Sequence, residues 1–180
     1  ALLGFESGAF ASVSYSGYGH FDSDRWMDGV GELGQNKNWS DHGIARQRLT
    51  HAVTADEEAQ LKAARNYGAS QWTGSTDIPS LDHHQHFGPI IISCDHADLR
   101  PTAKGVWVDG HFDVTLEALP PPTLPRIEVI DEFYNAIAHD KPVLHSGAWA
   151  RATTAVSLAI LASSQSGRVQ IPQYQVTPEC

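Results

Sequence analysis

Apolar side chains recur at helical spacing between residues 125 and 139. The stripe consists of Ile127, Ile130, Phe133 or Tyr134, and Ile137. These positions share one face because an α-helix turns once in about 3.6 residues. Pro125 suits the first turn, where its missing N–H costs nothing. The pattern therefore predicts an amphipathic helix over Pro125–His139.

A second apolar stretch follows and is richer in small aliphatic residues. Ala148–Ser164 carries Ala, Leu, Ile and Val over more than half of a helical circumference, which predicts a buried helix. Ser146 can cap its first turn through the side-chain hydroxyl. Gly167 can adopt the left-handed conformation that ends a helix. The alternation in Arg168–Ile171 then predicts a short closing strand.

Alternating and β-branched patterns predict strands in the rest of the chain. Ala1–Phe5 and Ala9–Tyr15 flank the turn Glu6-Ser7-Gly8 and predict a β-hairpin. Pro89–Cys94 is a β-branched run and predicts a buried strand.

A second hairpin is predicted farther along the chain. Lys104-Gly105 turns the chain into Val106–Val108, and Asp109-Gly110 is the strongest hairpin signal in the sequence. His111–Leu116 is expected to return as the partner strand.

One polar helix is predicted between the first hairpin and the strands that follow residue 89. Thr54 and Glu57 match a capping box, and Gly68 marks the predicted end of a helix over Thr54–Tyr67. Gly68–Leu81 is expected to be a loop. Strands, a helix, strands and two helices in this order predict an α+β fold. We expect a single domain over residues 1–180, an open, mostly antiparallel sheet with helices packed on one face.

Composition narrows the possible classes of protein. The chain has 180 residues, 41% of them hydrophobic, with a mean hydropathy of −0.29. Twelve basic and twenty-one acidic residues give a net charge of −9, which argues against a nucleic acid or an anionic membrane as partner. Its two cysteines form no disulfide framework, so a cytoplasmic location is expected.

The loop from Ser16 to Asn38 holds the best candidates for ligand contact. It places an aromatic wall, an imidazole, carboxylates and a guanidinium directly after a strand, and binding sites favour loops on rigid scaffolds. The candidate residues are Tyr18, His20, Asp22, Asp24, Arg25 and Trp26. A subunit interface or a loop that satisfies its own polar groups explains the same residues equally well.

Four other patterns receive structural interpretations. Residues 29–34 spell G-x-G-x-x-G but neither close an apolar strand nor open a helix, so we expect no nucleotide cofactor there. The histidines at 83, 84, 86 and 96 lack the spacing of a metal-ligand set, so no metal is expected. Asp98 and Arg100 are interpreted as a local ion pair that shapes a turn. Cys94 is interpreted as an inert hydrophobe at the end of a buried strand.

The C-terminal pattern resembles the end of the Gfo/Idh/MocA family of NAD(P)-dependent oxidoreductases. The matching residues are Phe133, Ala136, Ile137, Pro142, Gly147 and Ala150. Asp140-Lys141 stands where that family usually has a Gly before the Pro, and Ser146 replaces the usual Asp. Ala9–Trp26 and His86–Gly110 are similar to the branch that contains dihydroxyphthalate and phthalate-dihydrodiol dehydrogenases.

This resemblance implies that the chain corresponds to the C-terminal domain, which supplies substrate contacts and the oligomer interface. The NAD- or NADP-binding Rossmann domain and the catalytic residues of the family would precede Ala1, so no catalytic residue is assigned here. The resemblance implies substrate contacts at Tyr18, His20, Asp22, Arg25, Trp26, His84 and His86. It also implies a homo-oligomer, a dimer or a tetramer, built through the sheet.

Three functions stay open from the sequence. The first is the substrate-binding and oligomerisation part of an NAD(P)-dependent dehydrogenase, which acts on an aromatic cis-dihydrodiol such as a dihydroxyphthalate precursor. The second is a free-standing binding or assembly module without catalysis. The third is a metalloenzyme that uses the histidine cluster. A strand–GxGxxG–helix and a Glu-Lys-Pro motif upstream of Ala1 would decide for the first, and metal analysis tests the third.

Overall fold

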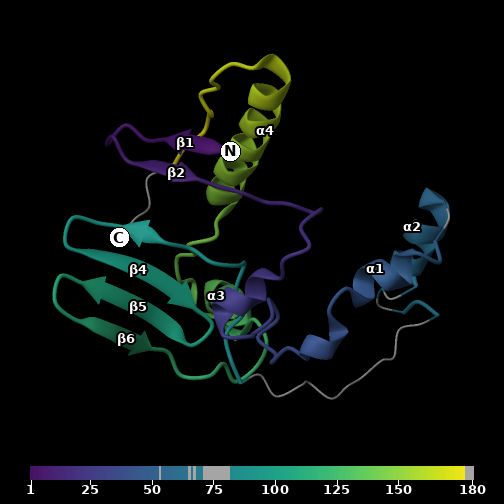
Figure 1. Cartoon of the computed structure of the whole chain (residues 1–180). Helices are drawn as coiled ribbons and strands as arrows, with labels where there is room; N and C mark the ends of the chain where they lie inside the picture. The colour runs from purple at the N-terminus through teal and green to yellow at the C-terminus, as the bar shows by residue number, and fades with distance from the viewer. Residues whose placement is uncertain (53, 65, 67, 71–81, 177–180) are drawn as a thin grey trace. The chain divides into compact units, whose positions relative to one another are not determined.

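The computed structural model describes residues 1–52, 54–64, 66, 68–70 and 82–176. The chain groups into two compact units, one of Ala1–Gly17 with Glu128–Cys180 and the other of Tyr18–Ile127. We call them unit 1 and unit 2 and describe each by itself (Figure 1). The expectation of one domain over residues 1–180 stays a prediction.

Unit 1 begins with the predicted hairpin. Strands β1 (Leu2–Gly4) and β2 (Phe10–Ser12) are antiparallel, with Leu3 opposite Ala11. Gly8 in the turn has a φ of 88°, which a glycine adopts without steric cost. The prediction of this hairpin is confirmed.

Two helices complete unit 1. Helix α3 (Ile127–His139) starts later than predicted, because Arg126 has a φ of 58° and breaks the helical path after Pro125. Helix α4 (Gly147–Ser166) has the predicted ends, since the Ser146 hydroxyl accepts a hydrogen bond from the Trp149 N–H and Gly167 is left-handed. Of the residues expected to be buried on α4, only Ala152 is fully buried in this chain.

The strand predicted for Arg168–Ile171 is wrong. These residues have no strand conformation in the structure, and Val169 and Ile171 are 92% and 89% exposed. Alternation alone does not make a strand, because each strand needs a partner to pair its backbone groups.

Unit 2 contains a four-stranded antiparallel sheet in the order β3-β4-β5-β6 (Figure 1). Its strands are β3 (Ile92–Ser93), β4 (Ala97–Thr102), β5 (Gly105–Gly110) and β6 (Val114–Ala118). The predicted turn at Lys104 is confirmed between β4 and β5. The α+β class and the antiparallel sheet are confirmed, whereas the packing of helices on one sheet face stays a prediction.

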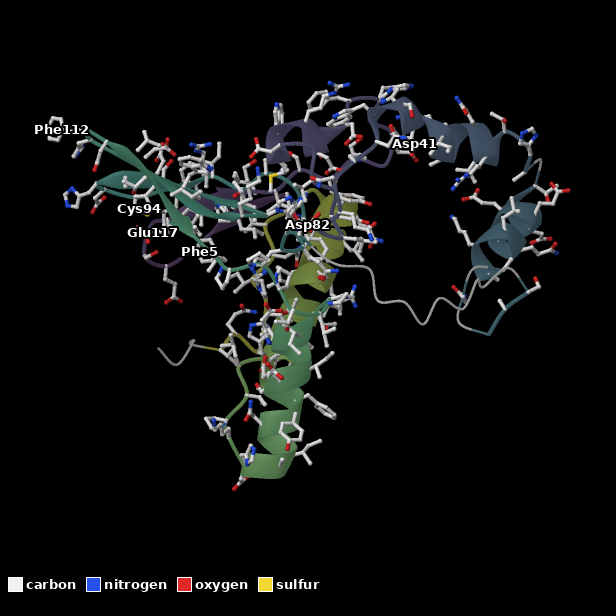
Figure 2. The ribbon with its side chains drawn as sticks, turned by 90° about the horizontal axis from the view of Figure 1, so that it is seen from below. Phe5, Asp41, Asp82, Cys94, Phe112 and Glu117 are labelled. Carbon is white, nitrogen blue, oxygen red and sulfur yellow. The ribbon has the colours of Figure 1, made fainter. Side chains whose placement is uncertain are left out.

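The strongest turn signal of the sequence lies inside a strand. Asp109 and Gly110 belong to β5 and pair with Asp98 and Ala97 of β4, so the turn falls after them, at residues 111–113. Figure 2 shows Phe112 at this tip, where its side chain is fully exposed.

A cross-strand ion pair explains why Asp109 stays in the strand. Its carboxylate accepts two hydrogen bonds from the Arg100 guanidinium, at 2.6 and 3.0 Å, and Asp109 thereby has a pKa below its usual range. The local pair predicted between Asp98 and Arg100 is therefore wrong, since Arg100 reaches the next strand instead.

The predicted buried strand over Pro89–Cys94 is also wrong in extent and burial. Only Ile92 and Ser93 pair with β4, at an edge of the sheet, and Ile91 is 68% exposed. Cys94 is exposed too, so it does not end a buried strand.

Short helices fill the rest of unit 2. They are the 3₁₀ helices η1 (Ser23–Met27) and η2 (Trp39–Asp41) and the α-helices α1 (Ile44–Leu49) and α2 (Ala55–Ala63). The predicted capping box of α2 is present in both directions, between Thr54 and Glu57. The helix ends at Ala63, earlier than predicted, while most of the loop expected over Gly68–Leu81 lies outside the described residues.

The buried centre of unit 2 is small and lies at one end of the sheet. Met27, Val30 and Ala103 are 3%, 1% and 2% exposed. Met27 ends η1, Val30 follows it, and Ala103 lies in the β4–β5 turn. The salt bridge between Asp28 and Lys104 joins the same two segments. Among the helices that the structure describes, none is long and apolar enough to cross a membrane.

Candidate functional site

The segment of residues 18–38, here called the aromatic loop, has a defined fold. Asp22 caps η1 by accepting a hydrogen bond from the Asp24 N–H at 3.1 Å. The Gly29 carbonyl accepts from the Lys37 N–H at 2.8 Å, and Val30 pairs with Asn36 as an isolated β-bridge. This glycine-rich stretch is therefore an ordered loop with its own backbone hydrogen bonds.

A lysine that the sequence did not single out neutralises the acidic start of the loop. The Lys37 ammonium forms salt bridges with Asp22, at 2.7 Å, and with Asp24. Burial raises the pKa of Asp22, but the hydrogen bonds from Lys37 and from the Asp24 N–H outweigh this effect and hold the pKa below its usual range. Burial lowers the pKa of Lys37, and its two carboxylate partners more than reverse that effect. Both side chains are therefore charged at neutral pH.

Residues 82–88, here called the histidine segment, attach to this loop through His86. The His86 Nδ1 accepts a hydrogen bond from the Gly88 N–H at 3.0 Å. Its Nε2 lies 2.8 Å from the Val30 carbonyl, which can only accept. The ring is therefore the neutral tautomer with its proton on Nε2, and both nitrogens are engaged with backbone groups. In this conformation the imidazole positions the loop rather than acting as an acid, base or metal ligand.

The same segment also attaches to the sheet. The His84 N–H donates to the Ala103 carbonyl at 2.9 Å, and His84 Nε2 lies 2.8 Å from the Pro120 carbonyl. Gly34 of the loop lies under the carbonyl of His83, where a Cβ would come within 2.3 Å of the oxygen. The histidine segment thus connects the β4–β5 turn to the aromatic loop by backbone contacts.

Several aromatic side chains and one cation of the loop are exposed. The Arg25 guanidinium lies 4.5 Å from the ring centroid of Trp39. Trp26 packs on Phe21 with ring centroids 5.0 Å apart, yet Trp26 is 67% exposed. Tyr18 is 93% exposed. Each of these exposed rings can contact a flat organic ring.

The predicted contact residues therefore divide into three groups. Asp22, His84 and His86 are held by other parts of unit 2. Arg25 and Trp26 pack on aromatic neighbours, and Tyr18 and His20 are exposed. Sequence reasoning missed Lys37 and Trp39, and only the charge balance of the loop could have suggested Lys37 in advance.

The G-x-G-x-x-G run has a structural function in this loop. The Gly31 N–H donates to the Gln35 carbonyl and the Gly34 N–H donates to the Gly31 carbonyl, so residues 29–34 close a tight turn. They do not lead from a strand into a helix N-terminus, which a dinucleotide pyrophosphate requires. Residues 29–34 therefore do not fit the pyrophosphate of a nicotinamide dinucleotide. Among the described residues, no group of three or more His, Cys, Asp or Glu is arranged to hold a metal ion.

Comparisons with known proteins give the relationship of the whole chain. No family model matches it. Over 161 residues it is 36% identical to the 1-carboxy-3-chloro-3,4-dihydroxycyclohexa-1,5-diene dehydrogenase of Comamonas testosteroni, a match of 89% of this chain and 40% of that protein.

A solved structure is similar as well. The crystal structure of the "putative dehydrogenase" of Bordetella bronchiseptica RB50 superposes with a TM-score of 0.71 at 34% identity, over 93% of this chain and 42% of that one. The chain thus spans about two fifths of the length of either relative. Over nearly its whole length, it is related to a dehydrogenase of a dihydroxycyclohexadiene.

Proposed function

We propose that the chain is the substrate-binding and oligomerisation part of an NAD(P)-dependent dehydrogenase of the Gfo/Idh/MocA type. Its substrate would be a cis-dihydrodiol of a carboxylated aromatic ring, such as a dihydroxyphthalate precursor. The observation that carries the proposal is the 36% identity over 161 residues to a dehydrogenase of a carboxylated dihydroxycyclohexadiene. A module without catalysis would explain the fold but not that relationship.

The geometry of unit 2 supports the substrate-binding part of the proposal. The aromatic loop presents exposed rings and a guanidinium, while His86 and Lys37 fix its backbone from behind. Such a rigidly supported loop can orient a flat diol at low entropic cost. The redox cofactor is expected on residues outside this chain, because the glycine run at 29–34 closes a turn.

Two experiments test this function. Sequencing the gene upstream of Ala1 should show a strand–GxGxxG–helix pattern and a Glu-Lys-Pro motif. The complete gene product, incubated with a carboxylated cis-dihydrodiol and NAD⁺ or NADP⁺, should produce the reduced cofactor, measured by its absorbance. An upstream sequence without a nucleotide-binding unit, together with no cofactor reduction, would favour the free-standing module.

The oligomerisation part of the proposal rests on exposed apolar side chains. Val13 of unit 1 is 50% exposed and Ile91 of unit 2 is 68% exposed, and monomers rarely leave large apolar patches uncovered. A two-fold dimer is the commonest way to cover exposed apolar residues of either unit. Sedimentation at micromolar concentration should therefore give a dimer or tetramer, and a folded, soluble monomer would contradict this part of the proposal.

A further inference from the structure

Arg25 is a cation of the aromatic loop that forms no salt bridge with an acidic side chain among the described residues. Across the parts of the chain that the structure describes, the lysines and arginines of unit 2 that form salt bridges are Lys37, Lys62, Arg100 and Lys104, and Arg25 is not among them. Its interaction is with the ring of Trp39, at 4.5 Å. An arginine stacked on an aromatic face keeps the edge of its guanidinium available for a planar acceptor.

The Trp39 ring that contacts Arg25 is held in place by residues of the aromatic loop. Asn38 caps η2 by accepting from the Ser40 N–H at 3.2 Å, which sets the start of the helix at Trp39. The Trp39 ring packs closely on Gly29, where an added Cβ would lie 2.9 Å from its Cζ2. Because the ring is held, the guanidinium loses less conformational freedom when it binds a ligand than a free side chain would.

The carboxylates around Arg25 already have cationic partners. Asp22 and Asp24 share the Lys37 ammonium. Asp28, just after η1, pairs with Lys104 at 3.4 Å. The acidic neighbours of Arg25 are therefore paired with other cations, although the chain as a whole carries a net charge of −9.

We propose that Arg25, held on Trp39, is the residue that recognises the ring carboxylate of the substrate. The inference rests on the proposed function, because a carboxylated dihydrodiol is the ligand that supplies this group. A guanidinium edge pairs with a carboxylate through two parallel N–H···O bonds, which fixes the ring direction as well as adding affinity. The exposed indole of Trp26, one residue along η1, offers an apolar face beside that pair. Arg25 is thus a residue that selects carboxylated over unsubstituted rings.

Binding of two matched ligands to the complete gene product tests this role. The probes are 3,4-dihydroxybenzoate and catechol, which differ only in the carboxylate, titrated by calorimetry. The variants are Arg25→Gln and Arg25→Lys, with Arg48→Gln on α1 as a control that also removes one exposed arginine. Arg25→Gln should weaken dihydroxybenzoate roughly ten- to hundredfold, the usual range for a charge-assisted hydrogen bond, and should leave catechol within about twofold by the same relation.

Arg25→Lys keeps a point charge without the planar fork, so it should lose part of the preference for dihydroxybenzoate. The same comparison of the two ligands can be made with Arg25→Lys if Arg25→Gln fails to fold. Equal affinity of the wild-type protein and Arg25→Gln for dihydroxybenzoate would overturn the proposal, as would an equal loss for both ligands. If the wild-type protein oxidises the dihydrodiol but Arg25→Gln keeps the carboxylate preference, only this inference fails. If the wild-type protein neither binds these ligands nor reduces the cofactor, the proposed function fails.

Discussion

Replacing His86 by alanine should loosen the aromatic loop from the sheet. The substitution removes the partner of the Val30 carbonyl, which belongs to a residue only 1% exposed. A buried polar group left unpaired costs about 1–3 kcal/mol. Loss of the acceptor for the Gly88 N–H adds about 0.5–1.5 kcal/mol. We therefore expect unit 2 to lose about 1.5–4.5 kcal/mol of local stability by the sum of these two contributions.

Two conservative variants separate the two hydrogen bonds. The amide nitrogen of Gln can reach the place of Nε2, so His86→Gln should keep the bond to the Val30 carbonyl and recover most of the loss. The amide oxygen of Asn can take the place of Nδ1, so His86→Asn should keep only the bond from the Gly88 N–H. His51→Ala, at an exposed histidine of the same unit, is the matched control.

Hydrogen exchange of loop amides measures the effect locally. The Gly31 and Lys37 N–H groups close the loop on the Gln35 and Gly29 carbonyls, at 2.9 and 2.8 Å. In His86→Ala they should exchange roughly ten- to 1,600-fold faster, since each 1.4 kcal/mol is a factor of about ten. Wild-type exchange rates at both amides in His86→Ala, or an equal effect of His86→Gln and His86→Ala, would refute this argument.

Three further predictions concern other parts of the chain. Gly105→Ala should destabilise the β4–β5 hairpin by about 1–3 kcal/mol, because the new Cβ would lie 2.3 Å from the Glu117 carbonyl oxygen; an unchanged melting temperature would contradict this. The stability contributed by Asp22 should be complete above its ordinary pKa of 3.8 and should be lost as the pH falls through its lowered pKa in the folded state. The stability contributed by Lys37 should be complete below its ordinary pKa of 10.5 and should be lost as the pH rises through its raised pKa in the folded state. In denaturation of Lys37→Met, the loss at high pH that Lys37 causes should be absent and the loss at acid pH should be smaller, because Asp22 keeps its hydrogen bond from the Asp24 N–H; pH profiles equal to those of the wild-type protein would contradict this. Ile91→Asp should dissociate the proposed oligomer in sedimentation, and an unaffected oligomer would place the interface elsewhere.

Local signals in the sequence determined the ends of individual elements. The capping box of Thr54 and Glu57 and the two ends of α4 at Ser146 and Gly167 appear as predicted. Each of these features depends on hydrogen bonds between residues no more than four positions apart. Neighbours in sequence are therefore sufficient to decide them, and the same holds for the hairpin turn at Gly8.

The tertiary structure decided which of two plausible local structures each ambiguous segment adopts. Asp109 and Gly110 favour a turn by composition, but Arg100 on the adjacent strand holds Asp109 in the ladder. The isoleucines before Cys94 favour a buried strand, but β3 is an edge strand with a single neighbour in unit 2. In the first segment a contact with the adjacent strand decides the structure, and in the second the position at the edge of the sheet does, so neither follows from local preference alone.

The candidate site divides in the same way. Sequence reasoning identified the aromatic loop and the histidines from their chemistry, and the contact residues it named lie on two segments that the structure joins. Only the fold showed that His86 reaches Val30, 56 positions away, and that it is committed to backbone hydrogen bonds. Only the fold placed Arg25 on Trp39 and Lys37 between two carboxylates. Residue types determine which interactions a chain can make, but the partner that each side chain meets depends on chain reversals that no local pattern encodes.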